Sequence, residues 1–135
     1  MINRPYDIIE KLLTDITRVF AELMGYDTTD ALEEIQKYYQ GWLGLGRAFL
    51  AEHTPEELLD FLINEKEFSP EQLELLAQLI GKEGEILVRD QQISIGKYQI
   101  QKALVIFDYV EQQSKLFSLQ RRATINQLTA LLNLV

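Results

Sequence analysis

Hydrophobic residues recur at steps of three and four over most of this chain, a spacing typical of amphipathic helices. The first such segment begins near Asn3 or Arg4. Pro5 suits its first turn, where a missing N–H is no loss. Gly25 is expected to stop it, because glycine adopts the left-handed conformation at little cost. The apolar stripe of this first helix consists of Ile8, Ile9, Leu12, Leu13, Ile16, Val19, Phe20, Leu23 and Met24.

The second segment starts at Thr29 or Asp30 and keeps the helical period until three glycines interrupt it. Each glycine costs about 1 kcal/mol relative to alanine inside a helix. Two interpretations are open. Either the helix breaks within residues 41–46 and restarts over residues 47–52, or Gly41, Gly44 and Ala48 form a smooth face for a neighbouring helix. We favour the break, which divides one helix into two.

Two later helix starts share one pattern. Residues 54–58 read Thr-Pro-Glu-Glu-Leu, and residues 69–73 read Ser-Pro-Glu-Gln-Leu. In each, a hydroxyl side chain caps the helix, proline takes the first turn, and acidic residues meet the positive end of the helix. Glu57 or Gln72 then closes a capping box. These signals predict a short helix over residues 55–64 and a long one from residue 70 to residue 89 or 90.

The last third of the chain predicts two more helices. A turn over residues 91–96 leads to a helix from about Lys97 to Ser114 or Lys115, and Ser118 caps a final helix through residue 131 or beyond. Apolar residues spread around much of this charge-poor final helix. We therefore expect it to be buried on most sides, either centrally or in a subunit interface.

The pattern contains no convincing alternating strand, so the predicted fold class is all-α. Short turns between the helices favour antiparallel neighbours. We predict a single domain, residues 1–135, of six or seven antiparallel helices arranged as a bundle or as an array of helix hairpins.

Composition excludes several functions. The 135 residues hold 13 Lys and Arg against 21 Asp and Glu, a net charge of −8, and residues 52–74 supply −7 of it through eight acidic residues and one lysine. This balance argues against nucleic acid and anionic membranes as partners. With no cysteine and a single histidine, thiolate metal sites and cysteine nucleophiles are excluded, and no cofactor is expected. No signal peptide or membrane span is apparent, which favours a cytoplasmic location.

The candidate catalytic features have simpler explanations. His53 directly precedes a helix cap, so we interpret it as a surface or capping residue rather than a general base. The pairs Glu57/Asp60 and Glu71/Glu74 have the spacing with which all-helical nucleotide pyrophosphohydrolases bind magnesium. However, both pairs lie in first turns that already favour acidic residues. We predict that the protein is not an enzyme, and a magnesium-dependent nucleotide hydrolase of this kind is the alternative.

An aromatic group on the second helix is the candidate binding surface. Tyr38 and Trp42 are four residues apart and share a face, Tyr39 is adjacent, and Arg47 is a possible polar neighbour. Tyrosine and tryptophan are enriched in binding hot spots and are also common at the margin of a core. We favour the core and keep these four residues as a possible interaction surface. A small-ligand sensor with a pocket near Trp42 is a further alternative.

Residues 96–107 resemble the second helix of a tetratricopeptide repeat, where Ala103, Phe107 and Val110 fit the small–aromatic–small spacing. No second copy occurs at the period of that repeat. Nearly the whole chain also resembles a family of small, uncharacterised bacterial helical proteins. This resemblance rests on residues 4–7, 23–25, 54–59, 75–80 and 103–104. It implies a tetratricopeptide-repeat-like helical fold and supplies no catalytic residues.

The leading functional hypothesis is a non-enzymatic helical protein–protein interaction module of the bacterial cytoplasm. It rests on the helical pattern and on the lack of a catalytic constellation. The final helix predicts a homodimer formed through that helix. Arg121 and Arg122 are expected to pair with the acidic segment of a neighbour.

Overall fold

The computed structural model describes residues 5–135, with side chains described from Ile8 onward. The expected helix start at Asn3 or Arg4 lies outside this range. Within it the chain forms seven α-helices and no strand, which confirms the all-α fold class. The helices are α1 (Pro5–Leu23), α2 (Thr28–Leu43), α3 (Arg47–Glu52), α4 (Pro55–Asn64), α5 (Pro70–Arg89), α6 (Ile93–Gln113) and α7 (Leu119–Leu134).

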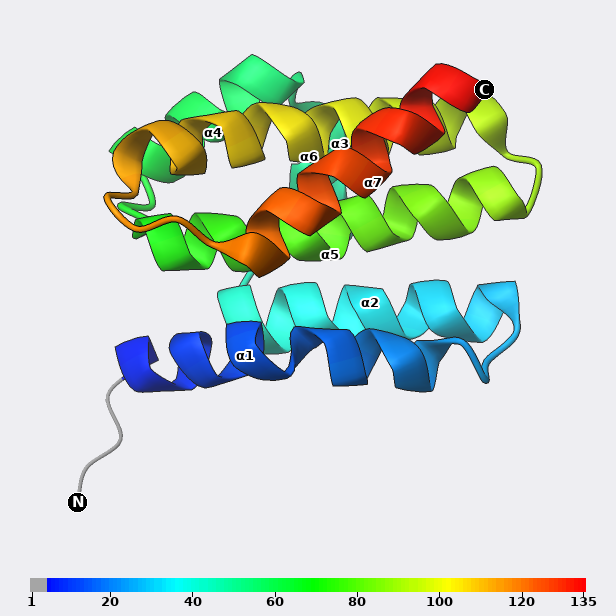
Figure 1. The fold of residues 1–135 in the computed structure, drawn as a ribbon, viewed down its shortest axis with the longest axis horizontal. Helices are drawn as coiled ribbons and strands as arrows, with labels where there is room; N and C mark the ends of the chain where they lie inside the picture. Colours follow the sequence, from blue (N-terminus) through cyan, green and yellow to red (C-terminus); the bar gives the residue numbers. More distant parts are fainter. Residues whose placement is uncertain (1–4) are drawn as a thin grey trace.

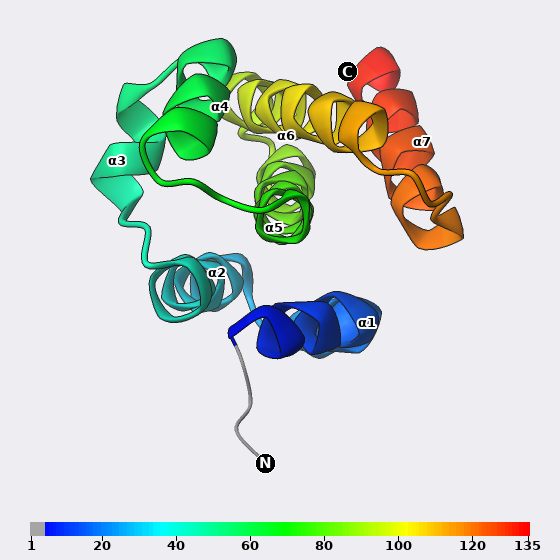
Figure 2. The same ribbon diagram turned by 90° about the vertical axis from the view of Figure 1, so that its left-hand side faces the viewer.

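Helix α5 is the centre of the fold. Viewed end-on, it is surrounded by α1 and α2 on one side and by α4, α6 and α7 on the other (Figure 2). It contacts α1, α2, α6 and α7 directly, while α4 packs on α6. Twelve of its twenty residues are buried, polar Gln78 and Glu85 among them. Figure 1 shows α1 and α2 side by side as a separate layer against α5. Among the described residues no helix has the length and hydropathy needed to cross a membrane.

Both proline-led helix starts are confirmed. The Thr54 hydroxyl accepts from the Glu57 N–H at 3.2 Å, and the Glu57 carboxylate accepts from the Thr54 N–H at 3.3 Å. Ser69 and Gln72 form the same reciprocal pair. Hydrogen bonds from Thr54 lower the pKa of the exposed Glu57 carboxyl, because they stabilise its ionised form. These boxes fix the starts of α4 and α5.

The second helix breaks in the glycine region, which confirms the favoured interpretation of the sequence. Gly44 is the residue after α2 and adopts a left-handed φ of 66°, and its N–H donates to the Gln40 carbonyl. The alternative of a smooth packing face is wrong, because a Cβ at Gly41 or Gly44 would meet no atom within 4 Å. Gly25 does not act as expected either. Bonds to carbonyls three residues back close the end of α1, and Gly25 does not take a left-handed φ.

The turn expected over residues 91–96 is largely helical. Helix α6 begins at Ile93, and Gln91 makes the turn with a φ of 67°. Gly96 lies in the first turn of α6, where this helix crosses α5. A Cβ at Gly96 would lie 2.9 Å from the Gly84 carbonyl oxygen, and one at Gly84 would lie 2.9 Å from the Gly96 carbonyl oxygen. Two glycines thus let the backbones of α5 and α6 touch.

The expectation that the final helix is buried on most sides is wrong for the single chain. Of the residues of α7, only Arg121 and Leu128 are buried, and Leu119 and Leu134 are exposed. Figure 1 shows α7 lying obliquely over the outside of the molecule. Its inner face contacts α5 and α6, Gln120 donates to Leu13 and Thr17 of α1, and Ala123, Asn126 and Ala130 are exposed.

Candidate functional site

The aromatic group on α2 divides into two parts. The rings of Tyr38 and Trp42 stack with centroids 4.2 Å apart and planes inclined by 9°, and both side chains are half-buried. Tyr39 points the other way and is fully buried in the core. Burial raises the pKa of the Tyr38 phenol, with a smaller contribution from Glu34. The four candidate residues therefore do not form one continuous surface.

Tyr39 belongs to a polar cluster around Glu83 of α5. The Glu83 carboxylate accepts from the Tyr39 hydroxyl at 2.9 Å, from the Gln36 amide at 3.0 Å and from the Gln99 amide at 2.7 Å. Burial first, and then the Glu83 charge and hydrogen bond, raise the pKa of Tyr39 well above its ordinary value. The phenol stays protonated and donates to Glu83. This cluster ties α2 and α6 to the central helix.

Lys102 of α6 is the second charge beside this cluster and is 1% exposed. Its Nζ donates to the Leu50 carbonyl at 2.9 Å and lies 4.9 Å from the centroid of the Tyr98 ring. Burial lowers the pKa of Lys102, and the Glu83 charge opposes that effect. A cavity of about 240 Å³ is lined by Lys102, Tyr39 and the exposed Arg47. Two of the four candidate residues, Tyr39 and Arg47, thus line one cavity.

The charged side chains Glu83 and Lys102 at this cavity form hydrogen bonds that connect helices of the chain. Glu83 accepts three hydrogen bonds, and Lys102 links α6 to the carbonyl of Leu50 at the end of α3. Among the side chains that line it there is no serine, threonine, cysteine or histidine. We interpret the cluster as a polar clamp that fixes α2 and α3 on α5 and α6. Sequence reasoning missed it, because Glu83 lies between Lys82 and Glu85 and so does not stand out as a charge in α5.

The acidic pairs do not converge. Glu57 is used in its capping box, and Asp60 accepts from the Asn64 amide at 2.7 Å. Glu74 pairs with Arg121 at 2.9 Å. Among the side chains that the structure describes, from Ile8 onward, no group of three or more His, Asp or Glu is placed to hold a metal ion. The half-buried His53 ring lies against Phe49, and its Nδ1 is 2.8 Å from the Phe49 carbonyl oxygen.

Arg121 organises the connection between α6 and α7. Its side chain is 5% exposed and binds Glu74 at 2.9 Å, Glu111 at 3.0 Å and the Leu116 carbonyl at 3.1 Å. Burial lowers the pKa of Arg121, but hydrogen bonds and charges of Glu74 and Glu111 outweigh it and raise the pKa overall. Burial conversely raises the pKa of Glu74 despite its bond to Arg121. The acidic segment therefore pairs with Arg121 of its own chain.

Three exposed large apolar side chains lie close together in sequence at the turn that Arg121 holds. We call Leu116, Phe117 and Leu119 the apolar turn, and they are 80%, 73% and 78% exposed. The Ser114 hydroxyl donates to the Leu116 carbonyl at 3.0 Å and accepts from the Leu116 N–H at 3.3 Å. Because these bonds and Arg121 fix the backbone, the apolar side chains are presented outward from an ordered turn. The turn lies at one end of the molecule (Figure 1).

No protein-family model, no curated protein and no solved structure matches this chain. The proposals that follow rest on the surfaces, cavities and charges of the described residues.

Proposed function

We propose that this protein is a non-enzymatic helical protein-interaction module that forms a homodimer through the apolar turn and the outer face of α7. The observation that carries this proposal is the apolar turn, whose three large side chains are each more than two-thirds exposed. Clustered exposed apolar residues of this kind mark interaction sites more often than isolated ones. Arg121 and Ser114 hold the backbone in place, so little conformational entropy is lost on binding.

The outer face of α7 continues this surface. Exposed residues Leu119, Ala123, Asn126, Ala130 and Asn133 recur at steps of four and three, the seam spacing of paired helices. Exposed Leu134 lies beside the last of them. The small alanines permit close approach of a second helix in the middle of the seam.

This seam is complementary to itself in the antiparallel direction. When two α7 helices pair about a point between Asn126 and Gln127, Leu119 faces the partner's Leu134, and Ala123 faces the partner's Ala130. Large apolar residues then meet at both ends of the interface, and small ones meet near its centre. A two-fold interface requires this kind of self-complementarity.

Charge also favours α7 as the contact. Two copies of a chain with a net charge of −8 repel each other over most of their surfaces. From residue 112 onward the chain has Lys115, Arg121 and Arg122 and no acidic side chain. Arg121 and Arg122 are already paired with acidic residues of their own chain. The outer face of α7 is therefore close to neutral, so contact there avoids acid–acid repulsion.

Sedimentation equilibrium on the full chain tests the proposal. We expect the wild type to sediment at twice the chain mass of 15.7 kDa. In Leu119→Ser both copies lose a buried leucine, worth roughly 1.5–3 kcal/mol each, so association should weaken at least about a hundredfold. Tyr26→Ser is the matched control, because Tyr26 is 49% exposed in the α1–α2 connection, away from α7.

Tyr26→Ser should dimerise like the wild type, and circular dichroism should show all three chains equally helical. A wild type that remains monomeric at millimolar concentration would overturn the homodimer. So would a Leu119→Ser chain that associates as strongly as Tyr26→Ser.

A further inference from the structure

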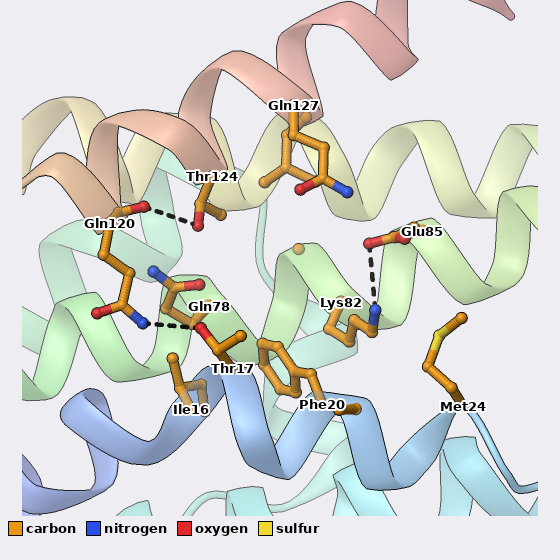
Figure 3. A pocket seen from close by; sticks show the side chains of 13 residues that line it. Ile16, Thr17, Phe20, Met24, Gln78, Lys82, Glu85, Gln120, Thr124 and Gln127 are labelled. Atoms are coloured by element: carbon orange, nitrogen blue, oxygen red, sulfur yellow. Dashed lines mark hydrogen bonds and ion pairs between the residues drawn. The ribbon is translucent and has the colours of Figure 1, made fainter.

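The cavity between α1, α5 and α7 has its polar groups at two separate ends. Its volume is about 230 Å³. Figure 3 shows Gln78, Thr17 and Gln120 at one end and Lys82 with Glu85 at the other. Lys82 pairs with Glu85 at 3.5 Å, and the buried Nε2 of Gln78 has no acceptor within the described chain. One carboxylate or amide therefore does not reach both ends, and the cation at this cavity is already neutralised by its own chain.

A groove between α4 and α6 instead brings its apolar and charged side chains together at one place. Its volume is about 480 Å³, and it is lined by the half-buried side chains of Leu59 in α4 and of Leu104, Val105 and Tyr109 in α6. We call these four residues the apolar floor. A single half-exposed apolar residue is ordinary, whereas several gathered around one groove are typical of an interaction surface. The floor is therefore suited to apolar side chains from outside the chain.

The charged side chains at this groove are acidic. Exposed Glu56 of α4 and exposed Asp108 of α6 line it, and no lysine or arginine is among the lining residues. Glu56 has no ion-pair partner within the described chain, and Asp108 accepts from the neutral Gln112 amide at 3.0 Å. Helix α4 itself has three acidic residues and no basic one, within the segment 52–74 that carries −7. A complementary occupant is therefore basic.

The length of the groove suits a helix. Its lining along α6 runs from residue 104 to residue 112, about 12 Å at 1.5 Å per residue. A helix bound in a groove uses apolar anchors at i, i+3 or i+4, and i+7, which span about 10.5 Å. An extended peptide would need partners for its backbone N–H and C=O groups, whereas a helix satisfies them internally. The groove thus accommodates about two turns of an amphipathic helix.

A second copy of this chain does not supply such a helix. Among the seven described helices only α7 has a net positive charge, and its Arg121 and Arg122 are paired with acidic residues of their own chain. The other helices are neutral or acidic. The occupant that the charges favour is therefore a segment of a different protein.

We infer that the α4–α6 groove binds a basic amphipathic helix of a partner protein. Apolar residues at helical spacing contact the apolar floor, and flanking lysine or arginine residues pair with Glu56 and Asp108. This deepens the proposed interaction module by naming its partner. It is tested separately from the α7 homodimer, because no residue of α7 lines the groove and α4 and α7 lie on different sides of α6 (Figure 2).

Isothermal titration calorimetry of the full chain with three synthetic peptides of about five helical turns tests this. The basic amphipathic peptide has leucines at i, i+3, i+4 and i+7 and lysines elsewhere. The scrambled peptide has the same composition without an apolar stripe, and the acidic peptide has glutamate in place of every lysine. At roughly 0.15 M salt, which screens long-range attraction, we expect the basic amphipathic peptide to bind saturably with one site per chain. The scrambled peptide should bind at least about tenfold more weakly, and the acidic peptide should not bind.

Charge variants test the acidic residues of the groove. Glu56→Gln/Asp108→Asn removes two rim ion pairs, so binding of the basic amphipathic peptide should weaken about three- to tenfold. Glu22→Gln/Glu33→Gln is the matched control, because it changes the net charge equally at exposed positions of α1 and α2. It should bind the peptide like the wild type.

A neutral substitution tests the apolar floor. Val105→Gln places a polar amide among the floor residues, and glutamine is a good helix former, so α6 should remain intact. Binding should weaken about fivefold or more. Ile8→Gln is the matched control, because Ile8 is 49% exposed on α1. It should leave binding unchanged, and circular dichroism checks that all variants are folded.

The peptide's ¹H–¹⁵N shift changes should map to α4 and α6. The inference is overturned when the basic amphipathic peptide does not bind, when the scrambled or acidic peptide binds as tightly, or when the shifts map elsewhere. Groove variants that bind like their controls also overturn it. Sedimentation should show the same oligomeric state for Val105→Gln as for the wild type. A dimer lost in Val105→Gln would identify a second copy of the chain as the occupant and would overturn the inference.

Discussion

Replacing Gln78 with methionine removes the orphaned amide while keeping the side chain unbranched and of similar length. Gln78 lies in the middle of α5, is 3% exposed, and has a buried Nε2 that bonds to no acceptor in the described chain. Glutamine and methionine have similar helix propensities, so the backbone contributes little to the difference. The substitution therefore isolates the cost of burying an amide donor without a partner.

The expected change in the free energy of unfolding follows from the cost of burying the Gln78 amide without a partner. An unsatisfied buried polar group costs about 1–3 kcal/mol, and an apolar replacement of the same shape removes the penalty. We expect Gln78→Met to increase the free energy of unfolding by about 1–2 kcal/mol, with a melting temperature several degrees higher.

Urea unfolding followed by circular dichroism gives the free energy of unfolding, provided that the slope with denaturant is unchanged between variants. Gln101→Met serves as the control, because Gln101 is exposed on the neighbouring helix α6. It should change the free energy of unfolding by no more than about 0.5 kcal/mol. Destabilisation of Gln78→Met by 1 kcal/mol or more would show that the amide is satisfied in solution and would refute the reasoning.

Three further predictions concern the fold. Gly84→Ala should destabilise the protein by about 1–3 kcal/mol in urea, because its Cβ meets the Gly96 carbonyl, whereas Gly41→Ala in open space should stabilise it by about 1 kcal/mol. Arg121→Met should cost about 3–5 kcal/mol in the same assay, because it leaves Glu74 unpaired. Burial and Glu83 raise the pKa of Tyr39 above its value in the unfolded chain. The protonated Tyr39 therefore contributes fully to the free energy of unfolding below pH ~10, and this contribution decreases as the pH rises further. Stability measured above pH ~10 should therefore fall more steeply for the wild type than for Tyr39→Phe.

The elements that sequence predicts best are those fixed by short-range chemistry. The starts of α4 and α5 follow from caps whose partners are three residues apart. The break after α2 follows from Gly44, the position that needs a left-handed backbone. In these cases the residues that decide the structure are neighbours along the chain.

Contacts between residues far apart in sequence were beyond the same reasoning. The close approach of Gly96 to Gly84 becomes apparent only once α5 and α6 cross. Helix α7 has leucines around much of its surface, and composition does not reveal that Arg121 is the side chain buried against α5 and α6. Its partner Glu74 is 47 residues away.

The candidate site was predicted in part. Tyr39 and Arg47 do line one cavity, but the stacked pair of Tyr38 and Trp42 lies apart from it. The Gln78 cavity gave no signal in the sequence, because a glutamine inside a helix is ordinary until its burial and its missing acceptor are known. This cavity lies where α1, α5 and α7 meet. The hydrophobic period of one helix does not predict which residues of the other two helices face it.

Cysteine cross-linking tests the proposed α7 homodimer most directly. The chain contains no cysteine, so Asn126→Cys places a single thiol at the centre of the proposed antiparallel seam. A disulfide forms only when two Cβ atoms approach to about 3.5–4.5 Å. Under mild oxidation we expect a covalent dimer from Asn126→Cys and a monomer from Ala48→Cys, an exposed position on α3. A monomer from both variants, or equal cross-linking of both, would contradict the proposal that this protein works as a dimer joined through α7.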